Sequence, residues 1–289
     1  MEREFTVKEI ENKISEIRKQ NNGNKQIYTN YLPLVRADNQ ECFTGCEGKS
    51  TILYFTKTNI VNRIVFYSSD RDELIDMLKK CPKGMGLDIA SREREVEDDY
   101  IIEAGFHKIA LLQRLYYPDV TMEDEELWKN KKFSELYSNR NDEIVEYAKK
   151  GDEKELLTLF KQIFNIYIDH VPTEKELLEN YIEKDGMLVC RENGKIVALI
   201  GYLLNGKRMF LIHAVNISGD YRKLAALSVR LRDIALEKKV KFCYGMLELS
   251  ENREKALKYY QRRGTELVDF FNHIYANADI RSDVGEIVG

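Results

Sequence analysis

The chain has 289 residues, which suits two domains of roughly 140 residues each better than one. Hydrophobic residues make up 43% and charged residues 33%, so folded cores are expected, and the few prolines and the lack of a low-complexity tract argue against long disordered segments. The formal net charge of −4 lacks the basic excess that a nucleic-acid partner requires, and the apolar runs are too short to span a bilayer.

The cysteines and histidines indicate neither a disulfide framework nor a metal site. Five cysteines are scattered along the chain, and although Cys42 and Cys46 are four residues apart, no second pair follows at a zinc-like spacing. The four histidines are equally dispersed, so we expect reduced thiols and no metal. Because the first four residues, MERE, carry no apolar signal core, we expect a cytoplasmic protein without a membrane partner.

The first half predicts a helix followed by alternating strands and helices. Residues 5–20 carry four apolar side chains at helical spacing. Strands are expected over residues 27–36, 51–58, 61–68, 85–90 and 107–116, the second and third forming a hairpin. Helices are expected over residues 70–80, capped by Ser69 or Asp70, and over residues 93–104, closed by Gly105. A linker-like acidic stretch follows Pro118.

The second half repeats this alternation with more material at its start. Strands are expected over residues 144–148, 187–191, 196–204, 208–217, 241–249 and 267–275, and helices over residues 153–167, 174–183, 222–238 and 253–263. Both halves end in the order hairpin, helix, strand, charged helix closed by glycine, strand, which indicates a duplicated unit. We expect an α+β fold (three-layer α/β) with two similar domains, residues 1–137 and 138–289, each a mixed central sheet flanked by helices.

The order of elements over residues 144–275 resembles the GCN5-related N-acetyltransferase (GNAT) superfamily, and residues 220–227, DYRKLAAL, stand where these enzymes have their pyrophosphate loop. The usual pattern there is Arg/Gln-x-x-Gly-x-Gly/Ala, and here Ala225 replaces the first glycine and Leu227 the second. A leucine is bulky enough to narrow the phosphate cradle. The resemblance implies that backbone N–H groups at the start of a helix bind the diphosphate of acetyl-CoA or another acyl-CoA. The residues concerned are Arg222, Lys223, Leu224, Ala225, Ala226 and Leu227.

A second matching segment runs from Asn252 to Gly264. Residues 256–264, ALKYYQRRG, resemble the family stretch A-I-x-L-Y-E-K-L-G. The resemblance implies that Tyr260 protonates the departing thiolate, which a phenol can do because its ordinary pKa lies above that of a thiol. It also implies that Asn252 belongs to the cofactor site, although Asn252 lies one residue further from Ala256 than the pattern has it. Core packing is the alternative role for Tyr260.

The general base has two candidates, Glu248 and His213, each on a predicted strand. A solvated strand end is the alternative for Glu248, and packing in the wall of the fold is the alternative for His213. The backbone of Ala214, Val215 and Asn216 is implied to pair with the pantetheine arm, because this strand splays from its neighbour in the family.

A narrower resemblance concerns a group of bacterial GNAT proteins. Residues 167–177, YIDHVPTEKEL, and residues 187–202 match that group. The N-terminal portion of the group is matched by residues 27–31, 63–69 and 103–106. Asp169 and His170 are therefore candidate substrate-side residues, with a helix end and loop as the alternative.

These features predict an acyl-CoA-dependent N-acyltransferase, most simply an acetyltransferase, that acts on a small-molecule amine. The first half has no pyrophosphate loop and Asp70 would repel a diphosphate, so we interpret it as a degenerate copy. Two alternatives remain open: a catalytically inactive GNAT-like binding or regulatory protein, and an acyltransferase that uses an acyl carrier protein. The sequence also leaves a homodimer open.

Overall fold

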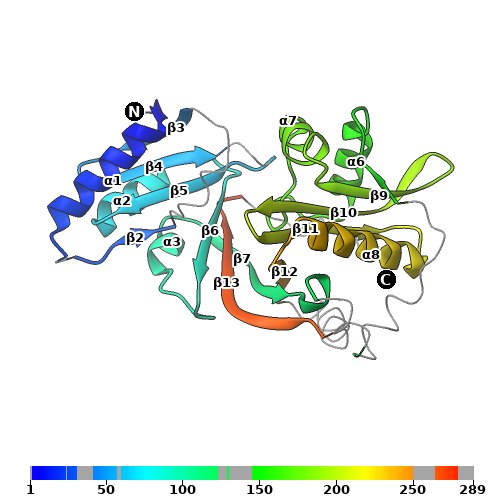
Figure 1. Ribbon diagram of the computed structural model, residues 1–289. Helices are drawn as coiled ribbons and strands as arrows, with labels where there is room; N and C mark the ends of the chain where they lie inside the picture. Colours follow the sequence, from blue (N-terminus) through cyan, green and yellow to red (C-terminus); the bar gives the residue numbers. More distant parts are fainter. Residues whose placement is uncertain are drawn as a thin grey trace. The chain divides into compact units, whose positions relative to one another are not determined.

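A computed structural model describes residues 2–23, 25–30, 42–56, 60–122, 129, 145–249 and 264–278 (Figure 1). The contacts between residues divide the chain into two compact units. Unit 1 contains Met1–Leu111, Phe164–Val171 and Phe271–Gly289, and unit 2 contains Leu112–Ile163 and Pro172–Phe270.

Unit 1 has three layers, with a mixed sheet between helices. Its elements are β1 (Arg3–Thr6), α1 (Val7–Asn21), β2 (Tyr28–Thr29), β3 (Cys42–Glu47), β4 (Thr51–Thr56), β5 (Arg63–Ser68), α2 (Arg71–Lys79), β6 (Gly86–Ser91), α3 (Asp99–Glu103) and the first residues of β7 (His107–Tyr116). Alternate residues of β4 enter different layers, as the two-residue period of a strand requires. Ile52 and Tyr54 pack with α1, whereas Leu53 and Phe55 pack with α2 and α3.

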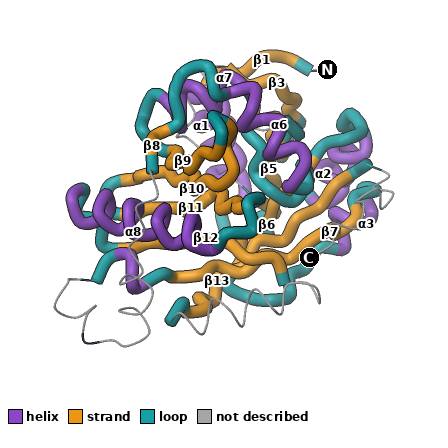
Figure 2. The backbone as a smooth tube through the Cα atoms, turned by 90° about the vertical axis from the view of Figure 1, so that its right-hand side faces the viewer, coloured by secondary structure: helices purple, strands orange, loops and turns teal. Residues whose placement is uncertain are grey.

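Unit 2 has the same layering, with strand order β7-β12-β11-β10-β9-β8. Its elements are η2 (Pro118–Val120), β8 (Glu146–Tyr147), α6 (Glu153–Ile163), α7 (Glu174–Glu176), the π-helical η3 (Leu177–Ile182), β9 (Met187–Glu192), β10 (Lys195–Asn205), β11 (Arg208–Asn216), α8 (Tyr221–Glu237), β12 (Phe242–Glu248) and the start of β13 (Glu266–Ala276). Leu231 of α8 packs on Met209 of β11, and Phe160 of α6 stacks on His213 of the same strand. The helices and strands of both units are shown in Figure 2. The α+β layering predicted from the sequence is therefore confirmed.

Each unit is completed by a strand from the other half of the sequence. In unit 1, β6 pairs antiparallel with residues 271–276 of β13. In unit 2, β12 pairs antiparallel with residues 112–116 of β7. The compact units therefore differ from a division of the chain between residues 137 and 138, because ladder hydrogen bonds tie the last strand of each half to the other half.

Several predicted elements have different bounds. The helix expected over residues 93–104 shortens to α3, because the buried side chains of that stretch begin at Tyr100. Two strands, β1 and β3, are additional to the prediction. The helix expected over residues 253–263 lies outside the described residues, and so does most of the strand expected over residues 27–36.

Candidate functional site

The parallel strands β11 and β12 begin side by side and then part. Their ladder ends after three pairs, at Phe210↔Tyr244, although β11 continues to Asn216 and β12 to Glu248. The antiparallel strand β10 pairs with β11 up to its last residue, so one edge of β11 is hydrogen-bonded throughout. Within the described residues, the other edge of residues 211–216 has no ladder partner. We call this stretch, where the two strands no longer pair, the split.

A β-bulge next to the split positions His213. The register of β10 against β11 shifts beside the pair Gly201↔His213 and leaves Ile212 as the extra residue. The imidazole is 2% exposed, stacks on Phe160 at 4.4 Å between ring centroids and lies 5.7 Å from the ring of Tyr181. A side chain at position 201 would place its Cβ 2.8 Å from Nδ1 of His213, so glycine is needed there. The geometry therefore favours a packing role for His213 over that of a general base.

The three strand residues assigned to the pantetheine arm occupy the split. Ala214 is exposed, Val215 is buried and Asn216 is half-buried. The Asn216 side chain shapes the turn into α8: its Oδ1 accepts from Ser218 N at 3.1 Å, and its Nδ2 donates to Asp220 O at 2.9 Å. Within the part of the chain that the structure describes, the backbone edge of residues 214–216 can therefore pair with a ligand, whereas the Asn216 side chain is already hydrogen-bonded.

The expected pyrophosphate loop is the first turn and a half of a helix. α8 begins at Tyr221, so the N–H groups of residues 225–227 lie where intrahelical bonds use them. Asp220 caps the helix: its carboxylate accepts from Arg222 N at 3.0 Å, and its carbonyl accepts from Lys223 N at 3.2 Å. These contacts use the amides that the resemblance assigns to a diphosphate.

A carboxylate and a paired cation stand together at this helix start. The guanidinium of Arg222 lies 2.6 Å from Asp220 Oδ2. The side-chain and backbone hydrogen bonds from Arg222 lower the pKa of Asp220 to about 2, so the group stays ionised at any ordinary pH. A diphosphate here would meet a negative charge and an arginine that is already paired. In this conformation the site does not fit the nucleotide end of acetyl-CoA.

The side chains of residues 223–227, which follow Arg222 in the expected loop, are buried or half-buried. Lys223 is buried, and its Nζ forms an ion pair with Glu192 at 2.9 Å. Leu227 is fully buried in the core that α8 forms with the sheet, with Leu224 packed against that core. Ala225 and Ala226 are also buried. Leu227 therefore does not narrow a phosphate cradle, because its side chain points into the core.

The other predicted catalytic and cofactor residues are only partly described. Glu248 ends β12, is half-buried and lies on the same side of the strand as Tyr244 and Met246. Tyr260 and Asn252 lie outside the described residues, so their roles stay predictions.

Unit 1 has an equivalent pair of parallel strands, but the corresponding edge is filled. β5 and β6 pair only at Arg63↔Gly86 and Ile64↔Leu87. Beyond these pairs, the same edge of β5 is covered by β2 and Asn30. The Asn30 side chain donates to Ile64 O at 2.8 Å and accepts from Phe66 N at 2.8 Å. In unit 1, this segment therefore occupies the position that corresponds to the split of unit 2. The polar residues of the segment did not indicate this role in the sequence.

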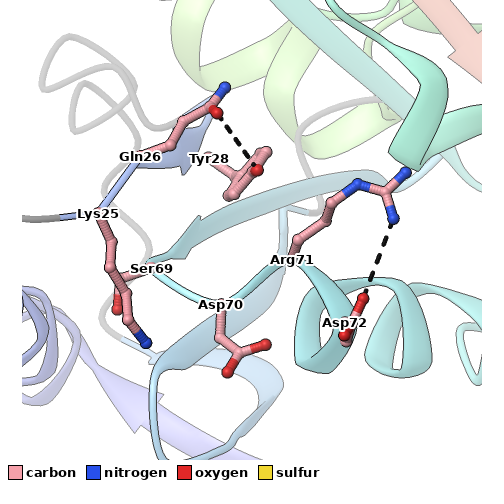
Figure 3. A pocket seen from close by; sticks show the side chains of 7 residues that line it. All are labelled: Lys25, Gln26, Tyr28, Ser69, Asp70, Arg71 and Asp72. Atoms are coloured by element: carbon pink, nitrogen blue, oxygen red, sulfur yellow. Dashed lines mark hydrogen bonds and ion pairs between the residues drawn. The ribbon is translucent and has the colours of Figure 1, made fainter.

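The strand-to-helix turn of unit 1 matches that of unit 2. Ser68 Oγ accepts from Asp70 N at 3.0 Å, as Ser218 Oγ accepts from Asp220 N at 3.1 Å. Asp70 caps α2 by accepting from Glu73 N. A pocket of about 330 Å³ lies at this turn. It is lined by Lys25, Gln26, Tyr28, Ser69, Asp70, Arg71 and Asp72, whose side chains are drawn in Figure 3. The lining contains both positive and negative side chains, and Arg71 forms an ion pair with Asp72 at 3.9 Å. The pocket is therefore not complementary to a diphosphate.

The candidate substrate residues Asp169 and His170 belong to unit 1. Asp169 Oδ2 accepts from Asn165 N at 2.9 Å and so stabilises its own loop. His170 lies near Asp88 of β6: burial raises the pKa of Asp88, and the nearby charges of Arg63 and His170 oppose that rise. Because these residues group with the other unit, their part in a site with the split stays a prediction.

Within the described residues, no group of three or more potential ligand side chains could hold a metal ion, and no helix is long and apolar enough to cross a membrane. All five cysteines are free.

Solved structures with this architecture include several N-acyltransferases. A GCN5-related N-acetyltransferase from Sphaerobacter thermophilus has a TM-score of 0.52 and 11% identity, over 84% of this chain and 83% of its own. One from Kribbella flavida has a TM-score of 0.51 and 12% identity, over 91% and 94%. A probable N-acyltransferase from Enterococcus faecalis V583 has a TM-score of 0.51 and 10% identity, over 96% and 71%.

No family model and no curated protein matches the sequence. The structural likeness nevertheless shows that the chain has the GNAT fold, as the sequence resemblance predicted. At these identities the comparison establishes the fold and leaves activity to the site.

Proposed function

We propose that unit 2 transfers an acyl group from a pantetheine thioester to an amine. The observation that carries this proposal is the split, where one backbone edge of residues 211–216 of β11 has no ladder partner among the described residues. A pantetheine arm contains two amide groups and can pair with such an edge as a short strand would. A backbone N–H of the same edge can stabilise the negative oxygen that forms as the amine attacks the thioester.

The remaining chemistry needs a base for the amine proton. Glu248 is the candidate, because it lies at the open end of β12 and a carboxylate can accept that proton. The amine nitrogen forms a bond to the acyl carbon, the carbon–sulfur bond breaks, and the departing thiolate takes up a proton. Tyr260 remains the candidate donor of that proton.

The donor is either an acyl-CoA, most simply acetyl-CoA, or the acylated phosphopantetheine of a carrier protein. Both present the same arm to the split. Asp220 favours the second donor, because its carboxylate and its contacts with Arg222 occupy the helix start that a nucleotide diphosphate would use. A carrier protein brings no such diphosphate group.

Calorimetry with acetyl-CoA and with acetyl-pantetheine, which ends before the phosphates, tests this proposal. If the split alone holds the donor, the two compounds should bind with similar affinity. Binding of acetyl-CoA more than tenfold tighter would show that the diphosphate is bound after all and would favour acyl-CoA as the donor. Binding of neither compound at millimolar concentration would contradict the acyltransferase proposal. Binding without release of free thiol, in a screen of amines, would favour the inactive alternative.

A further inference from the structure

One side of the sheet in unit 2 carries a row of aromatic rings around Tyr244. The register places Phe210 and Tyr116 on either side of Tyr244, with ring centroids 6.1 and 5.7 Å from it. The ring of Phe242 lies 6.1 Å from that of Tyr244 at an interplanar angle of 9°. Phe242 is 43% exposed and Met246, on the same side, is 39% exposed. We call the rings of Phe210, Phe242, Tyr244 and Tyr116 the aromatic face.

The aromatic face is not the side that α8 covers. Met209 and Cys243, which alternate with the aromatic residues along β11 and β12, are fully buried in the core with Leu231 of α8. The rings therefore point to the opposite side. Tyr116, Phe210 and Tyr244 are half-buried, and Phe242 and Met246 are exposed. Adjacent apolar side chains that remain partly accessible to solvent are typical of binding surfaces.

Arg114 adds a positive charge to this surface. It stands opposite Met246 in the ladder, and its guanidinium carbon lies 3.6 Å from the ring centroid of Phe270 and 5.4 Å from that of Tyr244. Burial lowers the pKa of Arg114, and the nearby charge of Arg208 adds to this effect. Neither arginine forms an ion pair with an acidic side chain in the part of the chain that the structure describes. The surface is thus complementary to an anion.

We propose that the aromatic face and Arg114 bind the acyl acceptor, and that this acceptor is an aromatic α-amino acid. Its ring would stack on the aromatic face and its carboxylate would bind Arg114. This assignment rests on the proposed acyltransferase function. The aromatic face lies next to the proposed pantetheine site, because Phe210 and Tyr244 form the last pair before the split. An amino acid bound here places its amine beside the thioester and on the same side of β12 as Glu248.

The reaction balances without a further reactant. The amine nitrogen bonds to the acyl carbon while the carbon–sulfur bond breaks and its electron pair leaves with sulfur. The proton that the amine loses equals the one that the thiolate gains. The products are an N-acyl amino acid and a free thiol.

The test separates binding at this surface from catalysis. Phenylacetate carries the ring and carboxylate of the acceptor, and phenethylamine carries the ring and amine. Ligand-observed NMR on the full chain, without any thioester, should show binding of phenylacetate and weaker binding of phenethylamine. Arg114→Gln should weaken phenylacetate binding on the order of tenfold or more, since a charged hydrogen bond is lost. Arg230→Gln is the matched control, because Arg230 also packs over a ring, that of Tyr147 at 5.8 Å, and should bind phenylacetate as the wild type does.

Thermal unfolding would check that both variants fold. If Arg114→Gln does not fold, Arg114→Lys keeps the charge and should bind phenylacetate more weakly than wild type but better than it binds phenethylamine. Equal binding of the two probes by the wild type, or unchanged binding by folded Arg114→Gln, would overturn the proposed site. Phenylacetate binding without acylation of phenylalanine by either donor would contradict the proposed function instead. Acylation of phenethylamine without phenylacetate binding would contradict the site and leave the function standing.

Discussion

The carboxylate of Asp220 accepts a hydrogen bond from the backbone N–H of Arg222 at 3.0 Å and pairs with the guanidinium of the same residue at 2.6 Å. One side chain thus caps α8, neutralises the nearest arginine and adds negative charge where a nucleotide would bind. The choice between a nucleotide-bearing donor and a carrier-bound donor therefore depends on Asp220.

Replacing Asp220 tests this dependence. Asp220→Ala should strengthen acetyl-CoA binding on the order of tenfold, because it removes the competing negative charge and the ion pair that this carboxylate forms with Arg222, while acetyl-pantetheine binding should not change. Calorimetry with the two compounds measures both effects. Asp70→Ala is the matched control, because it removes the same kind of cap in unit 1 and should alter neither affinity. Equal gains with both compounds would show that Asp220 does not oppose the phosphates.

The pH dependence of stability should report the same carboxylate. Its folded-state pKa of about 2 lies below the ordinary value of 3.8, so the stability that it contributes is fully present above about pH 4 and is lost as the pH falls towards 2. The difference in urea midpoint between wild type and Asp220→Ala should be constant from pH 5 to pH 8 and shrink below pH 4. A difference that already shrinks between pH 8 and pH 5 would contradict this assignment.

Leu227 should behave as a core residue rather than as a gate. Leu227→Ala should lower the free energy of unfolding by about 2–5 kcal/mol, because it opens a cavity beneath α8. Equilibrium urea unfolding measures this loss. Leu224→Ala, at a position that is only partly buried on the same helix, should cost less. A loss near zero for Leu227→Ala, together with tighter acetyl-CoA binding, would instead support the role in the phosphate cradle.

The edge of β5 should depend on Asn30. Asn30→Ala removes the hydrogen bonds to Ile64 O and Phe66 N, which should cost about 1–3 kcal/mol and speed hydrogen exchange at the amide of Phe66. Denaturation and exchange-detected NMR measure the two effects. Asn180→Ala removes a half-buried side chain whose hydrogen bond, among the described residues, is with Lys184, and it should change stability by less than about 0.5 kcal/mol. Unchanged exchange at Phe66 in Asn30→Ala would show that the side chain does not hold this edge.

Local sequence patterns predicted most of the helices and strands. They did not predict which strands from distant parts of the chain pair with each other. The hairpin of β4 and β5 follows from β-branched and aromatic residues around a short turn, and Asp70 was predicted as a helix cap. The sequences of β7 and β13 do not indicate that β7 pairs with β12 and β13 pairs with β6, because an apolar strand can pair with strands of either half.

The candidate site was also predicted only in part, because local patterns indicate single segments and not which distant segments come together. The family resemblance indicated the edge at residues 214–216, but it assigned residues 222–227, which form the start of α8, to a diphosphate-binding loop. The signal for the cap was present, since Asp220 precedes its helix just as Asp70 does, and the reasoning applied to Asp70 holds for both. Arg114 and the aromatic face could not be predicted, because strands β7, β11 and β12 bring these side chains together only in the folded sheet.

The strand exchange also sets the order in which this chain can complete its fold during synthesis. Unit 1 cannot finish its sheet on the ribosome until residues 271–276 have emerged, because they form the ladder with β6. Until then β6 exposes an unpaired edge, and unpaired edges recruit other strands. The nascent first half therefore keeps an edge that can pair with strands of other chains while the second half is being synthesised.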